Sequence, residues 1–403
     1  MKNRIRTVLP VLTVLILVSL APAGSFFTSS ARGIGVRLYS VSARGMGMGG
    51  TGLALSDVRS LATYNVSQWY QLRDTRIQSQ FSYQVDRSDV GKDVFSRSTG
   101  NFGGFSFAVP IERHRWVMGL SLTPYTQVDF DYKEDGTTEG KDFTESVFSK
   151  GTISKAQLSL VYSPHSKFAL AISANFYFGT IRDRFVFNFA DNSFFNSSHS
   201  IEYRFQGPGG GFSFNYRPSS RLNFGGFADF QSNLNVSRVF SSPVSNEKFN
   251  VTGGGHFPVH YGVGTSFQIH SGLLLAADYS AQNWGDGFGI AAIPREILED
   301  WWHVGAGLEH KIVHKQGEKF VDYMDLRGGF SVTQLGYKFN GNGVKEFALH
   351  GGLGIPFFSH VGRLDIGLKA GIRGRKSKNL ASEKFFKILF SVSMGELWFQ
   401  RPR

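Results

Sequence analysis

The sequence contains no cysteine, few prolines and, after residue 20, no long run of apolar side chains. The missing cysteines argue against a small exported fold that is held together by disulfides. A transmembrane helix needs about 20 apolar residues in a row, whereas here glycine, serine, asparagine or a charge interrupts every later stretch. Disulfide-stapled folds and transmembrane helices are therefore both excluded for the mature chain.

The first residues predict export. Lys2, Arg4 and Arg6 precede an apolar stretch over residues 8–20, and a small-residue motif, Ala-Pro-Ala, follows at 21–23. This order of basic, apolar and small residues is typical of a secretory signal peptide. We assign residues 1–23 to that peptide and exclude them from the fold.

Aromatic residues and glycine are abundant, with 39 Phe, 14 Tyr and 48 Gly. Transmembrane β-barrels have this profile, because each strand has one face toward lipid and one toward water. The net charge of +12 comes from basic residues that are scattered along the chain, which argues against nucleic-acid binding. For an exported protein, the expected partners of these charges are outer-membrane lipid and lipopolysaccharide.

Apolar and polar residues alternate in many segments, as strands with two different environments require. In 168–178 and 364–372, for example, Phe, Leu and Ile alternate with Ser, Asn, Asp, Lys or Gly. Divided at turn signals, the chain yields about fourteen strands. The predicted strands are 76–86, 99–110, 115–132, 143–163, 166–189, 198–217, 221–239, 256–269, 271–284, 300–313, 322–338, 344–358, 361–374 and 384–398.

A soluble β-sandwich or propeller would also show this alternation. On nearly every strand, however, one face is rich in Phe and Leu while the other carries Asp, Lys, Asn and Gly. A polar interior with an apolar exterior predicts an all-β fold, a transmembrane antiparallel β-barrel.

The connections suggest an orientation. Those at 110–115, 163–166, 217–221, 270–271 and 359–360 are short, whereas 86–98, 133–142, 240–255 and 284–300 are long and polar. Outer-membrane barrels pair short periplasmic turns with long outside loops. An even strand number and this alternation predict that both termini lie in the periplasm.

Residues 24–75 do not follow the strand pattern. They are rich in Gly, Ala, Ser and Arg, with a possible short helix at 57–64. We expect this segment to form a plug, or hatch, in the lumen of a barrel that comprises residues 76–403.

Residues 42–57 read SARGMGMGGTGLALSD, and similar boxes occur at 326–330 (LRGGF), 352–356 (GLGIP) and 395–399 (GELWF). At these boxes the chain resembles the FadL-type superfamily, the outer-membrane transporters for long-chain fatty acids and hydrocarbons, and also the PorV-type relatives of that superfamily. The resemblance implies a fourteen-stranded barrel closed by an N-terminal hatch. It also implies a hydrophobic ligand that leaves sideways through a gap in the wall.

The hatch candidates are Gly45, Gly47, Gly49, Gly50 and Asn65. A dinucleotide-binding loop would need a preceding strand and a following helix, so we expect the glycines to serve close backbone packing and positive φ. Where the family reads Asn-Pro-Ala, this chain reads Asn-Val-Ser at 65–67. Only Asn65 therefore carries over.

Four residues are candidates for a lateral opening. Pro124, next to Tyr125, interrupts the third strand, and Gly207 with Pro208 interrupts the sixth. Proline removes a ladder hydrogen bond, which can open the wall or simply form a bulge.

Charged residues on the predicted inner face are expected to pair with each other or with the plug; they are Asp229, Asp278, Asp325, Arg327, Asp365 and Lys369. Large aromatics at strand ends are expected to form interfacial belts; they are Trp284, Trp301, Trp302, Trp398 and Phe399.

The sequence offers no case for an enzyme, a cofactor or a metal site. His256 and His260 would share a strand face but lie about 13 Å apart, which is too far for a common ion. We therefore expect a passive outer-membrane channel of a Gram-negative-type bacterium, for hydrophobic small molecules such as long-chain fatty acids. The alternatives are a PorV-like partner that binds a secretion-system protein, and a structural porin.

Overall fold

The computed structural model describes residues 25–31, 34–39, 41–55, 57–138, 141–189, 196–242, 248–284, 297–311, 324–357 and 361–396. The predicted signal peptide lies outside these residues. Among the described residues, no helix is long and apolar enough to cross a membrane.

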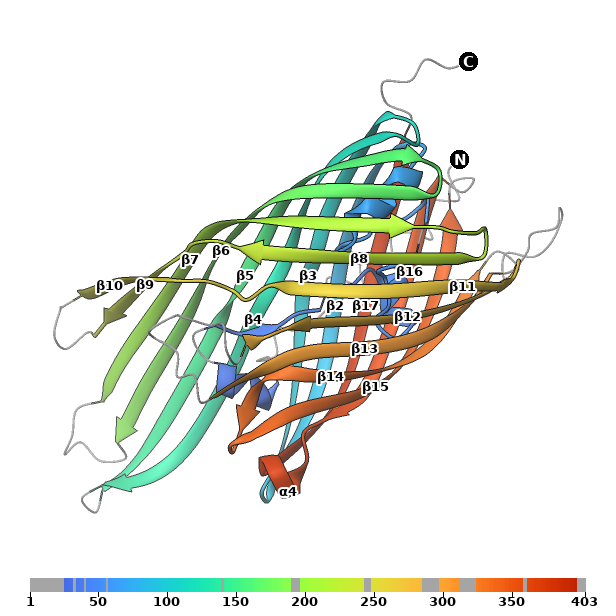
Figure 1. The fold of residues 1–403 in the computed structure, drawn as a ribbon. Helices are drawn as coiled ribbons and strands as arrows, with labels where there is room; N and C mark the ends of the chain where they lie inside the picture. Colours follow the sequence, from blue (N-terminus) through green and yellow to red (C-terminus); the bar gives the residue numbers. More distant parts are fainter. Residues whose placement is uncertain are drawn as a thin grey trace, which may run out of the picture.

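The described strands form one closed antiparallel barrel (Figure 1). Apart from β8 with β9 and β10 with β11, each wall strand pairs with the next one along the chain, and β17 pairs with β2 to close the wall. The wall strands are β2 (Thr75–Val90), β3 (Asp93–Glu112), β4 (Trp116–Thr138), β5 (Lys141–His165), β6 (Phe168–Phe189), β7 (Ser197–Tyr216), β8 (Leu222–Gln231), β9 (Leu234–Ser241), β10 (Lys248–Gly255), β11 (His260–His270), β12 (Leu273–Gln282), β13 (Leu298–Lys311), β14 (Asp325–Phe339), β15 (Asn342–Phe357), β16 (Gly362–Arg373) and β17 (Ala381–Glu396).

Two positions in the wall are occupied by pairs of shorter strands. β7 pairs with β8 and then with β9, and these two pair in turn with β11 and β10. The barrel therefore has fourteen wall positions in the described part of the chain. The predicted all-β antiparallel barrel and its strand number are confirmed.

The alternation places apolar side chains outside and polar ones inside. Ile172 and Leu349 are 63% and 73% exposed on the outer face, whereas Gln78 and Ser391 are buried on the inner face. This arrangement suits a wall between hydrocarbon and a polar lumen. The predicted outward and inward faces of residues 168–178 and 364–372 are confirmed.

The prediction of long loops at 86–98 and 133–142 is wrong. β2 continues to Val90 and β3 starts at Asp93, and β4 and β5 extend likewise. Outside a membrane both faces of a hairpin meet polar surroundings, so the hydrophobic alternation stops while backbone pairing continues. We call the end of the barrel where β2 begins and β17 ends the terminal end, and the opposite end the far end.

The length rule for connections also fails in places. Residues 91–92 and 340–341 make short turns at the far end, where the rule requires long loops. The helix α4 (Lys376–Asn379) lies in the far-end connection from β16 to β17.

The N-terminal segment runs along the inside of the barrel (Figure 1). It contains the 3₁₀ helix η1 (Phe26–Ala31), the short strand β1 (Val36–Arg37), the helix α2 (Ala43–Gly47) and the 3₁₀ helix η2 (Val66–Gln71). The helix predicted at 57–64 is absent, and helical turns form before and after it instead.

This segment spans the length of the lumen. Phe26 and Phe27 pack against Phe339 next to a far-end turn, whereas η2 packs against Val117 and Ala169 near the terminal end. The first described residues thus lie in the lumen toward the far end.

Candidate functional site

The wall strands β3 and β4 separate toward the far end. They pair from Glu112 opposite Trp116 to Phe105 opposite Leu122, and no pairing between them continues beyond that point in the described residues. β3 has a bulge here, with Gly104 at φ +136°, and β4 has a bulge between Pro124 and Thr126. Proline lacks an N–H for the ladder, so the sequence favours an interruption at this place.

β1 lies along the part of β4 that has left β3. Val36 is opposite Gln127, and Arg37 is opposite Thr126. Thr126 Oγ1 donates to the Ile34 carbonyl at 2.6 Å. The N-terminal segment thus supplies the neighbour that β3 no longer provides.

Side chains bridge the remaining separation. Gln127 Nε2 donates to Asn101 Oδ1 at 2.6 Å, and Arg97 donates to the Asp131 carbonyl. Both contacts connect β3 to β4 without backbone pairing, so this part of the wall is held by side chains alone.

Arg37 fastens β1 to the bulge. Its guanidinium donates to the Tyr125 carbonyl at 2.8 Å and to Gln282 at 3.1 Å, and it lies 3.0 Å from His260 Nδ1. It also lies 3.9 Å from the centroid of the Tyr125 ring. Arg37 therefore contacts neutral acceptors and the face of an aromatic ring. A planar guanidinium can make both kinds of contact at once better than an ammonium group can.

A cavity of about 150 Å³ lies between the N-terminal segment and the wall. Its apolar side includes Tyr39, Val41, Met46, Trp301 and Leu335. Its polar side includes Gln84, Asp86, Glu346, Lys369, Arg373 and Lys387. The cavity also extends to the separated strands β3 and β4, where it is lined by Thr99, Asn101, Gln127 and Asp129. The cavity is therefore amphipathic, and its described lining contains no Phe.

The glycines of α2 lie in tight contacts. A Cβ added at Gly45 would lie 2.0 Å from the Thr51 carbonyl oxygen, and one at Gly47 would lie 2.9 Å from the Cα of Gly352 on β15. Only glycine allows this segment to approach its own turn and the wall so closely.

The next two glycines also need their backbone conformation. Gly49 and Gly50 have φ of +80° and +78°. Their added Cβ atoms would lie 2.4 Å from the Ala306 carbonyl oxygen and 2.6 Å from the His303 ring. Gly50 alone of the four also lines the cavity. The expected packing role and positive φ are present at these positions.

Asn65 connects the segment to itself and to the wall. Its Nδ2 donates to the carbonyls of Leu53 at 2.6 Å and Phe214 at 2.9 Å, and its Oδ1 accepts from Ser67 Oγ at 2.5 Å. These bonds use the amide fully, so the structure places Asn65 as an anchor of the segment.

Gly207 and Pro208 lie where the partner of β7 changes from β9 to β8. Gln206 is opposite Asn235, and Gly209 is opposite Gln231. The Pro208 carbonyl accepts from Ser232 N at 3.2 Å. This is a bulge in a continuous wall, unlike the separation at Pro124 and Tyr125.

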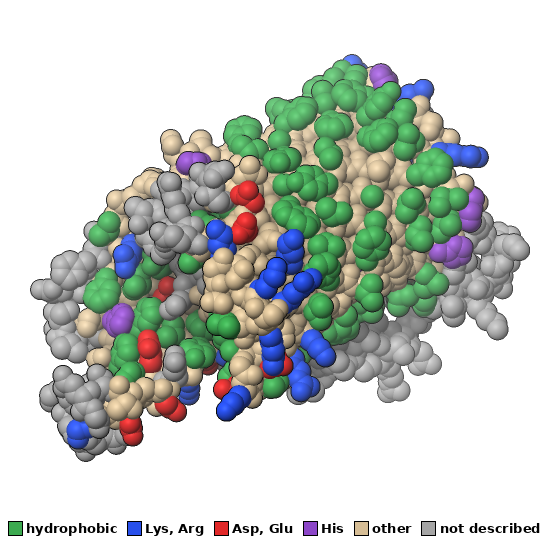
Figure 2. Space-filling view, turned by 60° about the horizontal axis from the view of Figure 1, so that its bottom comes forward, with side chains coloured by type: hydrophobic (Ala, Val, Ile, Leu, Met, Phe, Trp, Pro, Cys, Tyr) green, Lys and Arg blue, Asp and Glu red, His purple; other side chains and the backbone are tan. Residues whose placement is uncertain are grey.

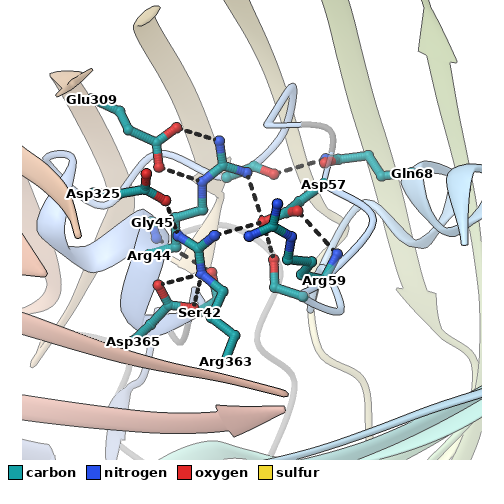
Figure 3. Close-up of polar contacts among 12 residues, drawn as sticks. Ser42, Arg44, Gly45, Asp57, Arg59, Gln68, Glu309, Asp325, Arg363 and Asp365 are labelled. Carbon is teal, nitrogen blue, oxygen red and sulfur yellow. Dashed lines mark hydrogen bonds and ion pairs between the residues drawn. The ribbon is translucent and has the colours of Figure 1, made fainter. Parts of the chain in front are cut away.

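Buried ion pairs link α2 to the wall (Figure 3). Arg44 Nε donates to Glu309 of β13 at 2.9 Å, and Arg44 Nη1 lies 3.4 Å from Asp57. Arg327 also donates to Glu309 at 2.9 Å. The side chains of Arg44, Glu309 and Arg327 are 2%, 0% and 0% exposed, so each charge depends on its partners.

The same network continues to β16. Arg363 lies 2.6 Å from Asp325 and 2.9 Å from Asp365, and Arg327 lies 2.8 Å from Asp365 (Figure 3 shows Arg363 between the two carboxylates). Arg363 is also 4.0 Å from Asp57 of the N-terminal segment. Three arginines and four carboxylates thereby join the segment to three strands of the wall.

The other predicted inner-face charges also have partners. Asp278 accepts from the backbone N–H groups of Gly52 and Leu53 at 2.6 and 2.8 Å. Lys155 lies 2.7 Å from Asp229, and Lys369 pairs with Glu346. The prediction that inner charges pair with one another or with the segment is confirmed.

Sequence reasoning missed Arg37, Arg44, Asp57, Glu309 and Arg363. Arg44 and Asp57 lie within the glycine box, and the strand alternation turns Glu309 and Arg363 inward. A charge in the glycine box together with inward charges on the strands could have indicated ion pairs between the segment and the wall. The sequence does not show which of these charges lie close together.

The aromatic-belt prediction is wrong for two tryptophans. Trp284 and Trp301 are 3% and 1% exposed and pack in an aromatic cluster inside the barrel. Trp302, on the outer face, is half-buried. Trp398 and Phe399 lie outside the described residues. The described residues contain no group of three side chains that could hold a metal ion.

The family described as BamG matches residues 1–403, and no curated protein matches the chain. Among solved structures, the CymD monoaromatic hydrocarbon channel is 14% identical, with 90% of this chain and 99% of that chain covered at a TM-score of 0.58. The Ralstonia pickettii toluene transporter TbuX is 15% identical (89% and 99%, TM-score 0.59). A Pseudomonas aeruginosa FadL homologue is 12% identical (89% and 98%, TM-score 0.61). At this identity the structures show a shared fold, and the FadL-type fold expected from the glycine box is confirmed.

Proposed function

Because the chain belongs to the BamG family and has a FadL-type barrel fold, we propose that it is an outer-membrane channel for passive uptake of hydrophobic small molecules. The observation that carries the proposal is the separation of β3 from β4 beside the cavity, where β1 takes the place of the missing strand. A short strand held mainly by side chains is easier to displace than a wall strand paired on both edges.

In this proposal, residues 24–75 act as the plug and the terminal end faces the periplasm. The predicted signal peptide and the apolar outer surface of the strands support the outer membrane as the location. A molecule that entered at the far end would reach the cavity and leave sideways between β3 and β4 once β1 moved.

The cavity bears on the cargo. CymD and TbuX are described as a monoaromatic hydrocarbon channel and a toluene transporter, but the lining here combines Tyr39 and Trp301 with Lys369, Arg373 and Lys387. An apolar body with an anionic head, as in a long-chain fatty acid, fits both sides. A cavity of about 150 Å³ holds only a small part of such a chain, so β1 and the residues after it must shift for passage.

A second function is favoured by the buried ion pairs. The ion pairs of Arg44, Glu309 and Arg363 hold the plug against the wall, and their side chains are nearly inaccessible to water. A permanently closed barrel suits a PorV-like role, in which the protein binds a secretion or assembly partner and passes no solute. Co-purification of a stable second polypeptide would support this alternative.

A disulfide lock separates the two functions. Val36 and Gln127 are opposite residues on neighbouring antiparallel strands, within reach of a disulfide, and the chain has no other cysteine. We expect V36C/Q127C in liposomes to lose fatty-acid uptake when oxidised and to regain it when reduced. The control pair S106C/S121C joins β3 to β4 where they already pair and should leave uptake unchanged.

The channel proposal fails if the unmodified protein does not accelerate uptake of fatty acid or toluene over empty liposomes. If uptake occurs but persists in the oxidised V36C/Q127C protein, passage beside β1 is ruled out.

A further inference from the structure

The outer face of the barrel changes from apolar to basic at one level near the far end. On β2 the outward residue after Val85 is Arg87, and on β17 the one beyond Phe386 is Lys384. Phe386 is opposite Val85 and Lys384 is opposite Arg87, so the two changes are in register. The apolar residues are 37% and 42% exposed, and both basic residues are exposed as well.

The neighbouring strands continue this boundary. On β15 the outward residue beyond Phe347 is Lys345. On β16, which lies between β15 and β17, Ile372 is opposite Phe347 on one side and opposite Lys384 on the other. Lys345 is exposed and lies 5.8 Å from the ring centroid of Trp302 on β13. Tryptophan on the outer face beside a cation is typical of the membrane–water interface.

α4 and its flanking residue add exposed cations just beyond this level. Lys376 lies 2.6 Å from Asp89, and Asp93 at the start of β3 is a second exposed acid. Figure 2 shows Lys and Arg side chains gathered at the edge of the hydrophobic surface. We call the following residues the basic patch: Arg87, Lys345, Arg375, Lys376, Lys378 and Lys384.

Most acids beside the patch along these strands do not neutralise it; the exception is Asp89, which shares the outward face of Arg87 and pairs with Lys376. Asp86, Glu346 and Glu383 alternate with Arg87, Lys345 and Lys384, so they face the lumen. There they pair with Arg373. The strand period therefore turns these three acids inward and Arg87, Lys345 and Lys384 outward at the same height.

The position of the patch relative to the apolar surface defines its surroundings. Two residues along a strand advance about 7 Å, so the cations lie one short step beyond side chains that suit hydrocarbon. That is the level of lipid headgroups. Lysine and arginine bind phosphate through charge-assisted hydrogen bonds, and clustered cations attract anionic lipid.

We propose that the basic patch binds the phosphate groups of a phosphorylated glycolipid of the outer leaflet, of the lipid A type. Six cations around four adjacent strands, of which only Lys376 is paired with an outward acid in the described part of the chain, match a headgroup with more than one phosphate. The inference depends on the proposed orientation, with the far end outside, and not on the identity of any transported molecule.

The test uses the full chain in phosphatidylcholine nanodiscs, with binding of bisphosphorylated lipid A measured at low and high salt. The variant K345Q/K378Q/K384Q removes three patch charges. The control variant R113Q/K167Q/R221Q removes three exposed charges from turns at the terminal end. Each lysine near an anionic lipid contributes about fivefold, so we expect affinity to fall on the order of 100-fold in the patch variant and less than about twofold in the control.

Two results would overturn the inference. One is equal loss of affinity in both variants, which would indicate a general charge effect. The other is equal binding of dephosphorylated lipid A or of phosphatidylglycerol, which would rule out glycolipid phosphate as the ligand. Labelling of K92C on intact cells checks the orientation separately, and unchanged uptake in the patch variant separates this site from the channel.

Discussion

The Arg37 guanidinium lies 3.9 Å from the ring centroid of Tyr125 and 2.8 Å from its carbonyl oxygen. One residue of the N-terminal segment thus holds both the side chain and the backbone of the β4 bulge, at the place where β4 leaves β3. The stability of the closed wall therefore depends on a contact between segments that are distant in sequence.

We expect Arg37→Met to release β1. The change removes the charged donor from the Tyr125 carbonyl and from Gln282 Oε1, which keep the Leu38 N–H and the Trp284 Nε1–H as donors. Hydrogen bonds from a charged group are worth about 1.5–3 kcal/mol. Hydrogen exchange at residues 34–38 should accelerate while wall strands such as β6 remain protected. Arg37→Lys keeps the charge and should show an intermediate effect; unchanged exchange in Arg37→Met would contradict this role.

Arg44→Met should destabilise the plug. It leaves Glu309 and Asp57 buried with fewer partners, and breaking a buried pair typically costs about 3–5 kcal/mol. We expect a lower midpoint of urea unfolding and faster proteolysis between residues 41 and 72. Arg182→Met, which removes an exposed partner of Glu202, is the control and should change the midpoint little.

The stability effect of Asp57 should depend on pH. Burial would raise the pKa of this carboxyl, but Arg44 and Arg363 more than offset burial and hold the pKa below its usual value. A depressed folded-state pKa contributes stability above the unfolded pKa of about 4, and this contribution is lost as pH falls below it. Asp57→Asn should therefore cost stability at pH 7, and the difference from the unmodified protein should shrink below about pH 4. A constant difference across this range would refute the assignment.

Gly49→Ala should displace the plug. The residue has φ +80°, and a Cβ would lie 2.4 Å from the Ala306 carbonyl oxygen, so strain and collision together should cost about 2–4 kcal/mol. Gly351→Ala on β15 is the matched control, because nothing lies within 4 Å of its added Cβ. Thermal unfolding should separate the two variants, and similar melting temperatures would show that the box is not tightly packed.

Pro124→Ala tests the wall separation directly. A restored N–H lets β4 pair further with β3, so uptake in liposomes should fall several-fold at normal barrel content. Gly207→Ala should instead reduce folding yield, because its Cβ would lie 2.3 Å from the Asn233 carbonyl oxygen, and uptake per folded barrel should stay constant. The opposite pattern would move the opening from β3–β4 to the bulge at Pro208.

The sequence alone determined the fold class, the strand number and the two faces of the wall. Alternation such as Ile172 outward and Asn175 inward reports the surroundings of each side chain, which a membrane barrel makes strictly periodic. The glycine box marked the segment that packs in the lumen. Where both faces are polar, as at Arg87 and Ser88, the pattern vanished and strand was taken for loop.

The tertiary structure alone decided how the N-terminal segment is held and where the wall separates. Arg44 and Glu309 are 265 positions apart, and only closure of the barrel brings such residues together. Trp284 and Trp301 looked like belt residues by position, yet strand ends in this barrel also border an aromatic interior. Local periodicity fixes the face on which a side chain lies, but the partner it meets across the lumen depends on register and curvature, which arise from pairing of the whole wall.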